Sequence, residues 1–268
     1  MPGCRTSAVL TMKILPEILL ESFRNHRGID IKAALQQLGE TFLRSDSFNF
    51  YTSVAVITSS RIEGEPMEVD SYIKHKIQQI EYLPELTQKP NDLFRAYIYA
   101  KENRLNKHNF LQAHRILTEH LLPEHWRGVY RQNAMVVMEH KTGRIQFEAA
   151  PADAVQSEMD KLWDDIEELL RTELSLEETF YYASFIHLLF VCIHPFNDGN
   201  GRAGRLLEKW FLSDKLGPVA WYIQSEQYYY RHVDSYYLNL NRLGMFYDQL
   251  DFTKAEPFLS MLQKALDS

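Results

Sequence analysis

Residues 194–205 have the composition of an anion-binding loop. In order they are His-Pro-Phe-Asn-Asp-Gly-Asn-Gly-Arg-Ala-Gly-Arg, and they join two segments with helical periodicity. Gly199 and Gly201 allow positive φ and close backbone approach. Where such a loop enters a helix, unpaired N–H groups and the helix dipole favour an anion. Arg202 and Arg205 lie three apart, on one face of that helix, so the sequence predicts a phosphate cradle with two cationic clamps.

Two other side chains of this loop can take part in phosphate chemistry. Asp198 can hold a divalent cation, since magnesium favours one or two carboxylates plus phosphate oxygens. His194 suits a general base, because the reference pKa of histidine is about 6.5. A Walker A loop is excluded by the missing Gly-Lys-Ser/Thr, and an EF-hand fails where Arg202 and Lys209 replace oxygen ligands. A plain helix–loop–helix corner explains the glycines but leaves the arginines and the histidine unexplained.

The composition sets limits on partners and location. The chain has 268 residues, 29 basic and 36 acidic, with a net charge of -7. That balance argues against a nucleic-acid or anionic-membrane binder, whose affinity rests on clustered positive charge. Cys4 and Cys192 do not form a disulfide scaffold, and no apolar stretch reaches the roughly 20 residues of a membrane span. We therefore expect a soluble, cytoplasmic protein, with neither nucleic acid nor membrane as a partner.

Helical periodicity dominates the elements that must hold the loop. Ser175 and Glu178 fit a capping box, which predicts a helix through residues 180–193 that ends before Pro195. Leu206 and Trp210 mark a second helix directly after the loop. Residues 135–138 and 145–147 predict a small hairpin around a turn at residues 141–144. The two prolines in residues 83–92 suggest a boundary between an extension, residues 1–91, and a main domain, residues 92–268.

The string HPFNDGNGRAGR matches, without a gap, the signature H-x-F-x-[D/E]-G-N-G-R-x-x-R of the Fic family. The segment Gly128-Val-Tyr-Arg131, followed by the hairpin, resembles that family's G-x-Y-R segment and its substrate-aligning flap. The resemblance covers residues 92–262. It implies a mainly α fold, in which a Fic-type helical core carries a small β-hairpin flap and an N-terminal helical extension.

The resemblance also implies a role for each position of the signature. His194 would deprotonate an incoming hydroxyl, Asp198 would bind Mg²⁺, and Phe196 would anchor the loop. Asn200 and the neighbouring backbone would form an anion hole. Gly201 points to nucleotidyl transfer, since phosphorylating members carry lysine there. The nucleotide- and phosphate-binding residues expected on this basis are Gly199, Asn200, Gly201, Arg202, Arg205, Tyr236 and Tyr237.

Three weaker motifs have simpler alternatives. The string from Ser59 to Gly64 resembles the family's inhibitory motif [S/T]-x-x-x-E-[G/N], whose glutamate, here Glu63, pairs with the last arginine of the signature. A capping box from Ser60 is the alternative. Tyr236 and Tyr237 match a pair near the adenine, or belong to a half-buried amphipathic helix. His187 is more simply explained as a core histidine with satisfied hydrogen bonds. The flap residues expected to pair with a target peptide through main-chain hydrogen bonds are Ile145, Gln146, Phe147 and Glu148.

These patterns lead to one preferred function and two alternatives. The preferred function is transfer of AMP from ATP to a Ser, Thr or Tyr hydroxyl of a target protein, or of the chain itself, with inhibition by Glu63. The first alternative is the reverse reaction, removal of AMP from a modified protein. The second is a nucleotide-sensing interaction module without turnover. A homodimer is left open by the sequence.

Overall fold

Helices make up most of the protein, as the sequence predicts. The computed structural model describes residues 12–25, 28–42, 48–138 and 143–267. Within these ranges the one sheet is a two-stranded hairpin. The α-helices are α1 (Leu20–Asn25), α2 (Ile31–Phe42), α3 (Phe48–Ile62), α4 (Val69–Gln78), α5 (Pro84–Glu102), α6 (Lys107–Leu117), α7 (Val155–Arg171), α8 (Leu176–Ile193), α9 (Asn200–Leu216), α10 (Ser225–Arg231), α11 (Val233–Asn241) and α12 (Glu256–Lys264).

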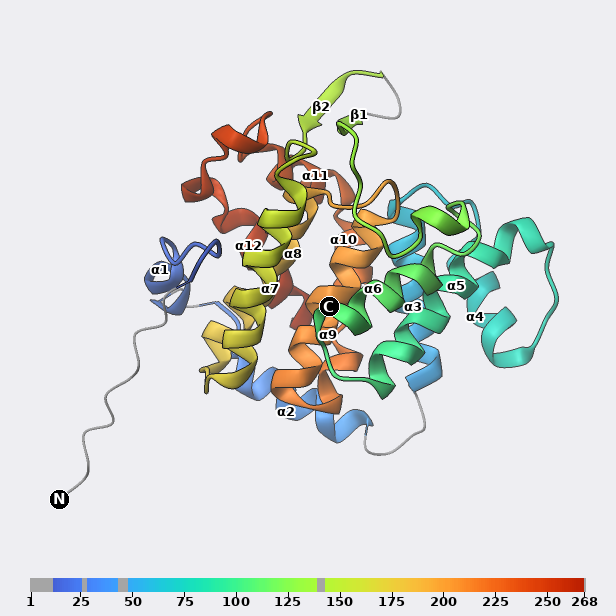
Figure 1. The fold of residues 1–268 in the computed structure, drawn as a ribbon. Coiled ribbons are helices and arrows are strands. Elements are labelled where there is room, and N and C mark those ends of the chain that lie inside the picture. Colours follow the sequence, from blue (N-terminus) through green and yellow to red (C-terminus); the bar gives the residue numbers. More distant parts are fainter. Residues whose placement is uncertain (1–11, 26–27, 43–47, 139–142, 268) are drawn as a thin grey trace.

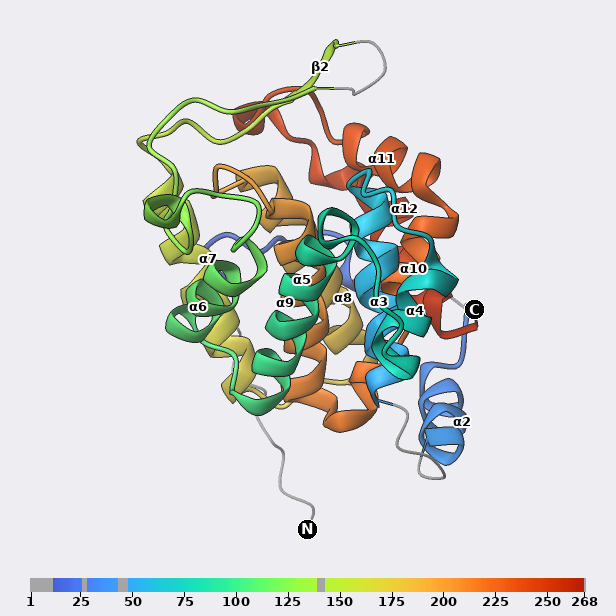
Figure 2. The same ribbon diagram turned by 90° about the vertical axis from the view of Figure 1, so that its right-hand side faces the viewer.

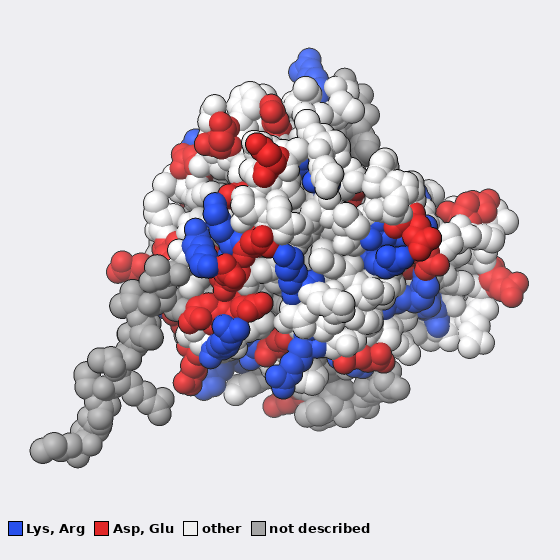
Figure 3. Space-filling view, in the orientation of Figure 1, with Lys and Arg blue, Asp and Glu red and all other residues white. Residues whose placement is uncertain are grey.

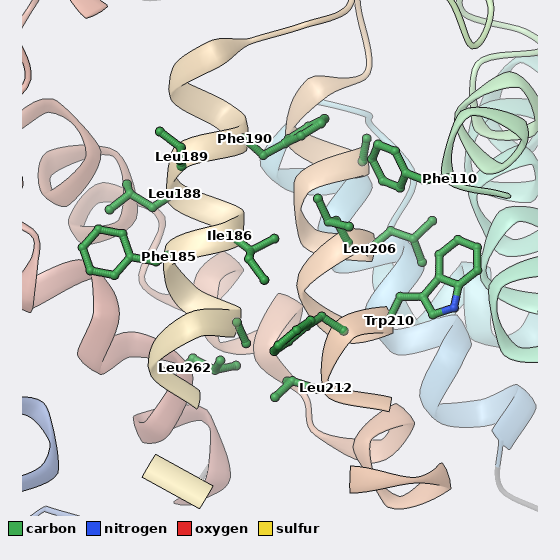
Figure 4. Packing of buried hydrophobic residues seen from close by; sticks show 14 of the residues in the cluster. Phe110, Phe185, Ile186, Leu188, Leu189, Phe190, Leu206, Trp210, Leu212 and Leu262 are labelled. Atoms are coloured by element: carbon green, nitrogen blue, oxygen red, sulfur yellow. The ribbon is translucent and has the colours of Figure 1, made fainter. Parts of the chain in front are cut away.

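Helix α8 forms the centre of the fold, with α9 beside it (Figure 1). The predicted capping box opens α8: Ser175 Oγ accepts from the Glu178 amide at 3.1 Å, and Glu178 Oε2 accepts from the Ser175 amide at 2.6 Å. Side chains of α8 are buried on both sides. Figure 4 shows Ile186 pointing toward α9 and Phe185 pointing the opposite way. The helix is therefore a core element, and its C-terminal end holds the loop of residues 194–199 in a fixed place.

The length and composition of α8 would allow it to cross a membrane. It has 18 residues with a mean hydropathy of 1.3, and 78% of that stretch is buried inside the protein. The core helix of a soluble protein meets the same criterion, so this is weak evidence for a membrane span.

The N-terminal helices are built into the same body as the rest. Helix α3 packs against α4, α5 and α10, and Figure 2 shows it beside α5 and α10. The predicted boundary at residues 83–92 is not a linker, because α5 runs unbroken from Pro84 to Glu102. Pro84 stands at the first turn, where proline favours a helix, and Pro90 is accommodated inside it. The predicted domain boundary between residues 91 and 92 therefore lies inside a continuous helix, and it stays a prediction.

The predicted hairpin is confirmed and projects from the helical body (Figure 1). Strands β1 (Val136–Met138) and β2 (Ile145–Glu148) pair antiparallel, with Val136 opposite Glu148 and an irregularity after Val137. Lys141 and Thr142 of the predicted turn lie outside the described residues. On the face shown in Figure 3, basic and acidic side chains are interspersed, and the region around the hairpin carries few charges.

Candidate active site

His194 caps the C-terminal end of α8 in a left-handed conformation, with φ 53° and ψ 57°. Few residues other than glycine adopt this region, so surrounding contacts must hold it. The Arg131 Nε donates to the carbonyl of His194 at 2.7 Å and supplies one such contact. The His194 Nδ1 lies 3.1 Å from the carbonyl oxygen of Val191, which can only accept. Nδ1 therefore carries the hydrogen, and Nε2 is left with a lone pair that can take a proton.

The surroundings of His194 keep its imidazole neutral. Burial lowers its pKa below the ordinary value, and the positive charge of Arg131 lowers it further. The hydrogen bond to Val191 and the charges of Glu63 and Asp198 act in the raising direction and are outweighed. A lowered pKa means that the base form is already present at neutral pH.

Phe196 and Asn200 brace the loop from within. Phe196 is fully buried, as the anchoring role requires. The Asn200 side chain accepts from the Phe196 amide at 2.9 Å and donates to its carbonyl at 2.8 Å. Both polar atoms of this side chain are thus bonded to the loop. The side chain of Asn200 thus holds the loop, while its backbone N–H and its second Nδ2 hydrogen can serve an anion, so the anion-hole role stays a prediction.

The loop delivers Asp198 and Gly199 to the N-terminus of α9. Gly199 precedes the helix with φ 80°, and a Cβ there would lie 2.9 Å from Thr118 Cγ2, so conformation and space both require glycine. The first N–H groups of α9 have no intrahelical acceptor. Asp198 is exposed, and its Oδ1 accepts from the Gly199 amide at 2.6 Å.

Arg202 and Arg205 present unused donors to this site. They are 4% and 0% exposed, respectively. Arg202 Nε and Nη1 and Arg205 Nη1 have no hydrogen-bond partner among the described residues. A buried polar group without a partner costs about 1–3 kcal/mol, more when it is charged. Three such groups at one helix N-terminus fit a site whose acceptors, the oxygens of an anion, arrive with a ligand.

Glu63 occupies part of this site. It follows the last residue of α3, and its Oε1 lies 2.6 Å from Arg205 Nη2. Arg205 also donates from Nε to Ser59 Oγ at 2.8 Å. Burial alone would raise the pKa of Glu63, but Arg205 and Arg202 outweigh it and hold the pKa below its ordinary value. The capping-box alternative is wrong, because Ser60 lies inside α3 and Glu63 beyond its end.

Gly201 lies directly beneath the Glu63 carboxylate. A Cβ built at position 201 would lie 2.2 Å from Glu63 Oε1 and 3.3 Å from Arg205 Nη1. The first distance is far shorter than any real contact. A side chain at position 201 and Glu63 in its present place therefore exclude one another.

Replacing Gly201 with alanine is expected to displace Glu63. Gly201 does not have positive φ, so alanine fits its helical backbone, and the end of the Glu63 side chain must move instead. ATP affinity should rise in Gly201→Ala but not when the same change is made in a Glu63→Gly chain. Calorimetry on the four chains of this double-mutant cycle measures the coupling. Equal effects in both backgrounds would show that the two residues do not compete.

The segment that carries this site matches a family model. Residues 104–212 match the model described as Fic/DOC family, and they include the whole loop and α9 through Leu212. This part of the chain is therefore similar to the Fic/DOC family. No curated protein sequence matches it.

Solved Fic structures share the fold at low sequence identity. A Fic family protein from Desulfovibrio desulfuricans G20 has a TM-score of 0.72 and 20% identity, covering 96% of this chain and 74% of that one. A Fic domain containing signaling protein from Bacteroides thetaiotaomicron VPI-5482 has a TM-score of 0.58 and 19% identity, and the match covers 92% of this chain and 91% of that one. Fic-1 from C. elegans has a TM-score of 0.57 and 17% identity, and the match covers 93% of this chain and 66% of that one. At these identities the likeness establishes the mainly α Fic fold.

Glu65 is a second acidic residue at this candidate site, and sequence analysis missed it. Its Oε1 lies 3.3 Å from Arg202 Nη2 and 3.0 Å from Lys89 Nζ. Glu63 thus faces the second arginine of the signature, and Glu65 faces the first. The sequence does contain a hint of this role: Glu65 follows Glu63 by two positions across Gly64. Residues two apart around a turn can contact neighbouring partners.

The two tyrosines of the predicted adenine site are placed differently from one another. Tyr236 is 2% exposed, and its hydroxyl lies 3.0 Å from His187 Nε2, so it offers no open face to a base. Only a role in the core beneath Arg205 fits this placement. Tyr237 is partly exposed and donates to the Ile62 carbonyl at 3.3 Å, so a base contact stays a prediction for Tyr237 alone. His187 is a core histidine as predicted, with its Nδ1 2.8 Å from Glu208.

The outer edge of β2 is partly occupied. The Glu148 amide donates to the Met245 carbonyl at 2.7 Å, and Glu148 forms a parallel bridge with Phe246. Glu148 is therefore not free to pair with a target peptide through its amide, which corrects that part of the flap prediction. For Ile145, Gln146 and Phe147, pairing with a target peptide stays a prediction.

Proposed function

We propose that this Fic protein transfers AMP from ATP to a hydroxyl group of a target protein. Fic domains are generally transferases, known for nucleotide transfer onto proteins. The observation that carries the proposal is the set of unpartnered buried nitrogens on Arg202 and Arg205 beside the neutral His194. The arginines would bind the outer phosphates of ATP, and the α-phosphate would then lie at the start of α9. Gly201, without the lysine of phosphorylating relatives, supports attack at the α-phosphorus.

The reaction balances without any further co-reactant. His194 Nε2 takes the proton of the target hydroxyl, whose oxygen then attacks the α-phosphorus. The bond from the α-phosphorus to the bridging oxygen breaks, and pyrophosphate leaves with the electron pair. The protein contributes position and charge stabilisation and forms no covalent intermediate with the substrate.

The residues present fit a magnesium ion that arrives together with the phosphates. Asp198 is exposed beside the anion site, and one carboxylate oxygen stays available while Oδ1 bonds the Gly199 amide. Among the described residues no cluster of three or more His, Cys, Asp and Glu side chains could hold a metal alone. Asp198 would thus hold the ion jointly with ATP, and the ion would neutralise phosphate charge.

Replacing Asp198 with alanine is expected to remove the magnesium dependence of ATP binding. Without a cation, a carboxylate next to phosphates is repulsive, so metal-free binding should stay equal or improve in Asp198→Ala. Calorimetric titration with ATP, with and without magnesium, measures both effects. Asp251→Ala, which removes a half-exposed carboxylate elsewhere, is the control. A magnesium response identical to that of the wild type would assign the ion to another residue.

The proposed activity is tested by mass spectrometry of a cell lysate incubated with ATP and the Glu63→Gly variant. We expect a mass increase of one AMP on a Ser, Thr or Tyr of particular proteins. The same experiment with a Glu63→Gly, His194→Ala chain should give none. If the modified proteins gain a phosphate instead, the transferred group has been misassigned.

The reverse reaction is the second candidate, and the position of Glu63 favours it. Its carboxylate lies against Gly201 and near enough to His194 to act on its pKa. A carboxylate there could orient a water toward an AMP-modified side chain. Removal of AMP would then need Glu63, whereas transfer is restrained by it. This candidate would be favoured if the wild type releases AMP from a modified protein and Glu63→Gly does not.

A further inference from the structure

The buried imidazole of His114 joins three parts of the site that are distant in sequence. Its Nε2 lies 3.0 Å from the carbonyl oxygen of Asp198, and its Nδ1 lies 3.0 Å from the amide nitrogen of Gly128. Its ring stacks on Phe196, with centroids 3.5 Å apart and planes 15° apart. The side chain is completely buried. Helix α6 thereby contacts the loop and the G-x-Y-R segment through one residue.

The two hydrogen bonds assign the tautomer of His114. The Gly128 amide can only donate, so Nδ1 accepts, and the Asp198 carbonyl can only accept, so Nε2 carries the hydrogen. The ring is therefore neutral, with both nitrogens bonded. Stacking on Phe196 fixes the ring plane as well, and the imidazole has one orientation.

This orientation is passed on to the Asp198 carboxylate through one peptide group. The carbonyl of that group, between Asp198 and Gly199, accepts from His114, and its amide donates to Asp198 Oδ1 at 2.6 Å. Hydrogen bonds in series polarise one another, so the first bond strengthens the second. The chain from His114 holds Oδ1 in place and leaves Oδ2 to a ligand.

We propose that His114 is a positioning residue for the carboxylate with which Asp198 binds magnesium. The inference rests on the proposed function, because it takes Asp198 as the metal ligand. Hydrogen-bonded groups that orient a metal ligand typically change metal affinity by about 10–100-fold when removed. His114 acts through the donor at Nε2, whereas its acceptor at Nδ1 serves only Gly128.

Two amide variants separate these functions. In His114→Gln the amide nitrogen can replace the Nε2 donor, and in His114→Asn the amide oxygen can replace the Nδ1 acceptor. Each variant keeps one hydrogen bond and loses the other. Both are made in the full Glu63→Gly chain, and calorimetry measures ATP binding without metal and over a range of magnesium concentrations. Thermal unfolding of each chain is the control for folding.

We expect His114→Asn to need about tenfold more magnesium for half-maximal ATP binding, with metal-free binding unchanged. His114→Gln should stay close to the parent. Equal magnesium requirements in the two variants would overturn the role of His114 while leaving the proposed function intact. If His114→Asn does not fold, a tenfold loss in His114→Gln would overturn it equally. A parent chain without magnesium-dependent ATP binding would contradict the proposed function and this inference together.

Discussion

Replacing His194 with alanine is expected to reduce AMP transfer by about 100-fold or more, the usual range for loss of a general base. ATP affinity should stay close to that of the parent, since the proposed function assigns the phosphates to α9, Arg202 and Arg205. The loss follows from the lone pair on Nε2, which the Val191 carbonyl fixes by holding the hydrogen on Nδ1. Single-turnover transfer and calorimetry on the same preparation measure the two quantities.

A second variant controls for the backbone of residue 194. Alanine in a left-handed conformation costs about 1–2 kcal/mol, whereas asparagine tolerates it. His194→Asn should therefore unfold at nearly the parental temperature and be as inactive as His194→Ala. Full transfer in either variant would remove His194 from the mechanism. Activity in the asparagine variant alone would mean that the loss in His194→Ala comes from backbone distortion.

Replacing Glu63 with glycine is expected to increase transfer by about 100-fold. Such a gain corresponds to about 2.7 kcal/mol of relieved competition, which one charge-assisted pair with Arg205 can supply because phosphate oxygens need the same donors. Glu68→Gly is the matched control. Glu68 lies five residues further along, is itself exposed, and among the described residues pairs with half-buried Arg61, so its loss should leave the rate unchanged.

Two further results are expected if Glu63 acts in this way. The first concerns Glu65, which still pairs with Arg202 in Glu63→Gly, so a Glu63→Gly, Glu65→Gln chain should be faster again.

The second concerns pH. The charge of Glu63 raises the pKa of His194, so its removal should lower that pKa and move the acidic fall in rate to lower pH. An acidic limb that shifts upward in Glu63→Gly would contradict the electrostatic contact between them.

The sequence was sufficient for the parts of the site that lie close together along the chain. The capping box at Ser175, the helix ahead of His194 and the loop into α9 all depend on local hydrogen bonds and periodicity, and they are confirmed. The hairpin followed from two short strand-like runs around a glycine-containing turn. These elements place His194, Asp198 and both arginines within one short segment, so their proximity needs no tertiary information.

Contacts between distant segments could not be predicted in the same way. Glu65 and Arg202 are 137 positions apart, and no rule of spacing connects them. His114 and Arg131 bind main-chain carbonyls and amides. Almost every residue has these groups, so the residue types in the sequence do not identify the partners. The continuous helix from Pro84 to Glu102 was not predicted for a different reason, because proline in a first turn begins a helix as readily as it ends one.

The most direct test is transfer of label from α-labelled ATP to protein by three full-length chains. We predict weak labelling by the wild type, strong labelling by Glu63→Gly, and none by Glu63→Gly with His194→Ala. A target-rich lysate is included, so that the result does not depend on the chain modifying itself. Equal labelling by wild type and Glu63→Gly would contradict the restraint by Glu63. Absence of labelling in all three chains, with label from γ-labelled ATP transferred instead, would contradict AMP transfer itself.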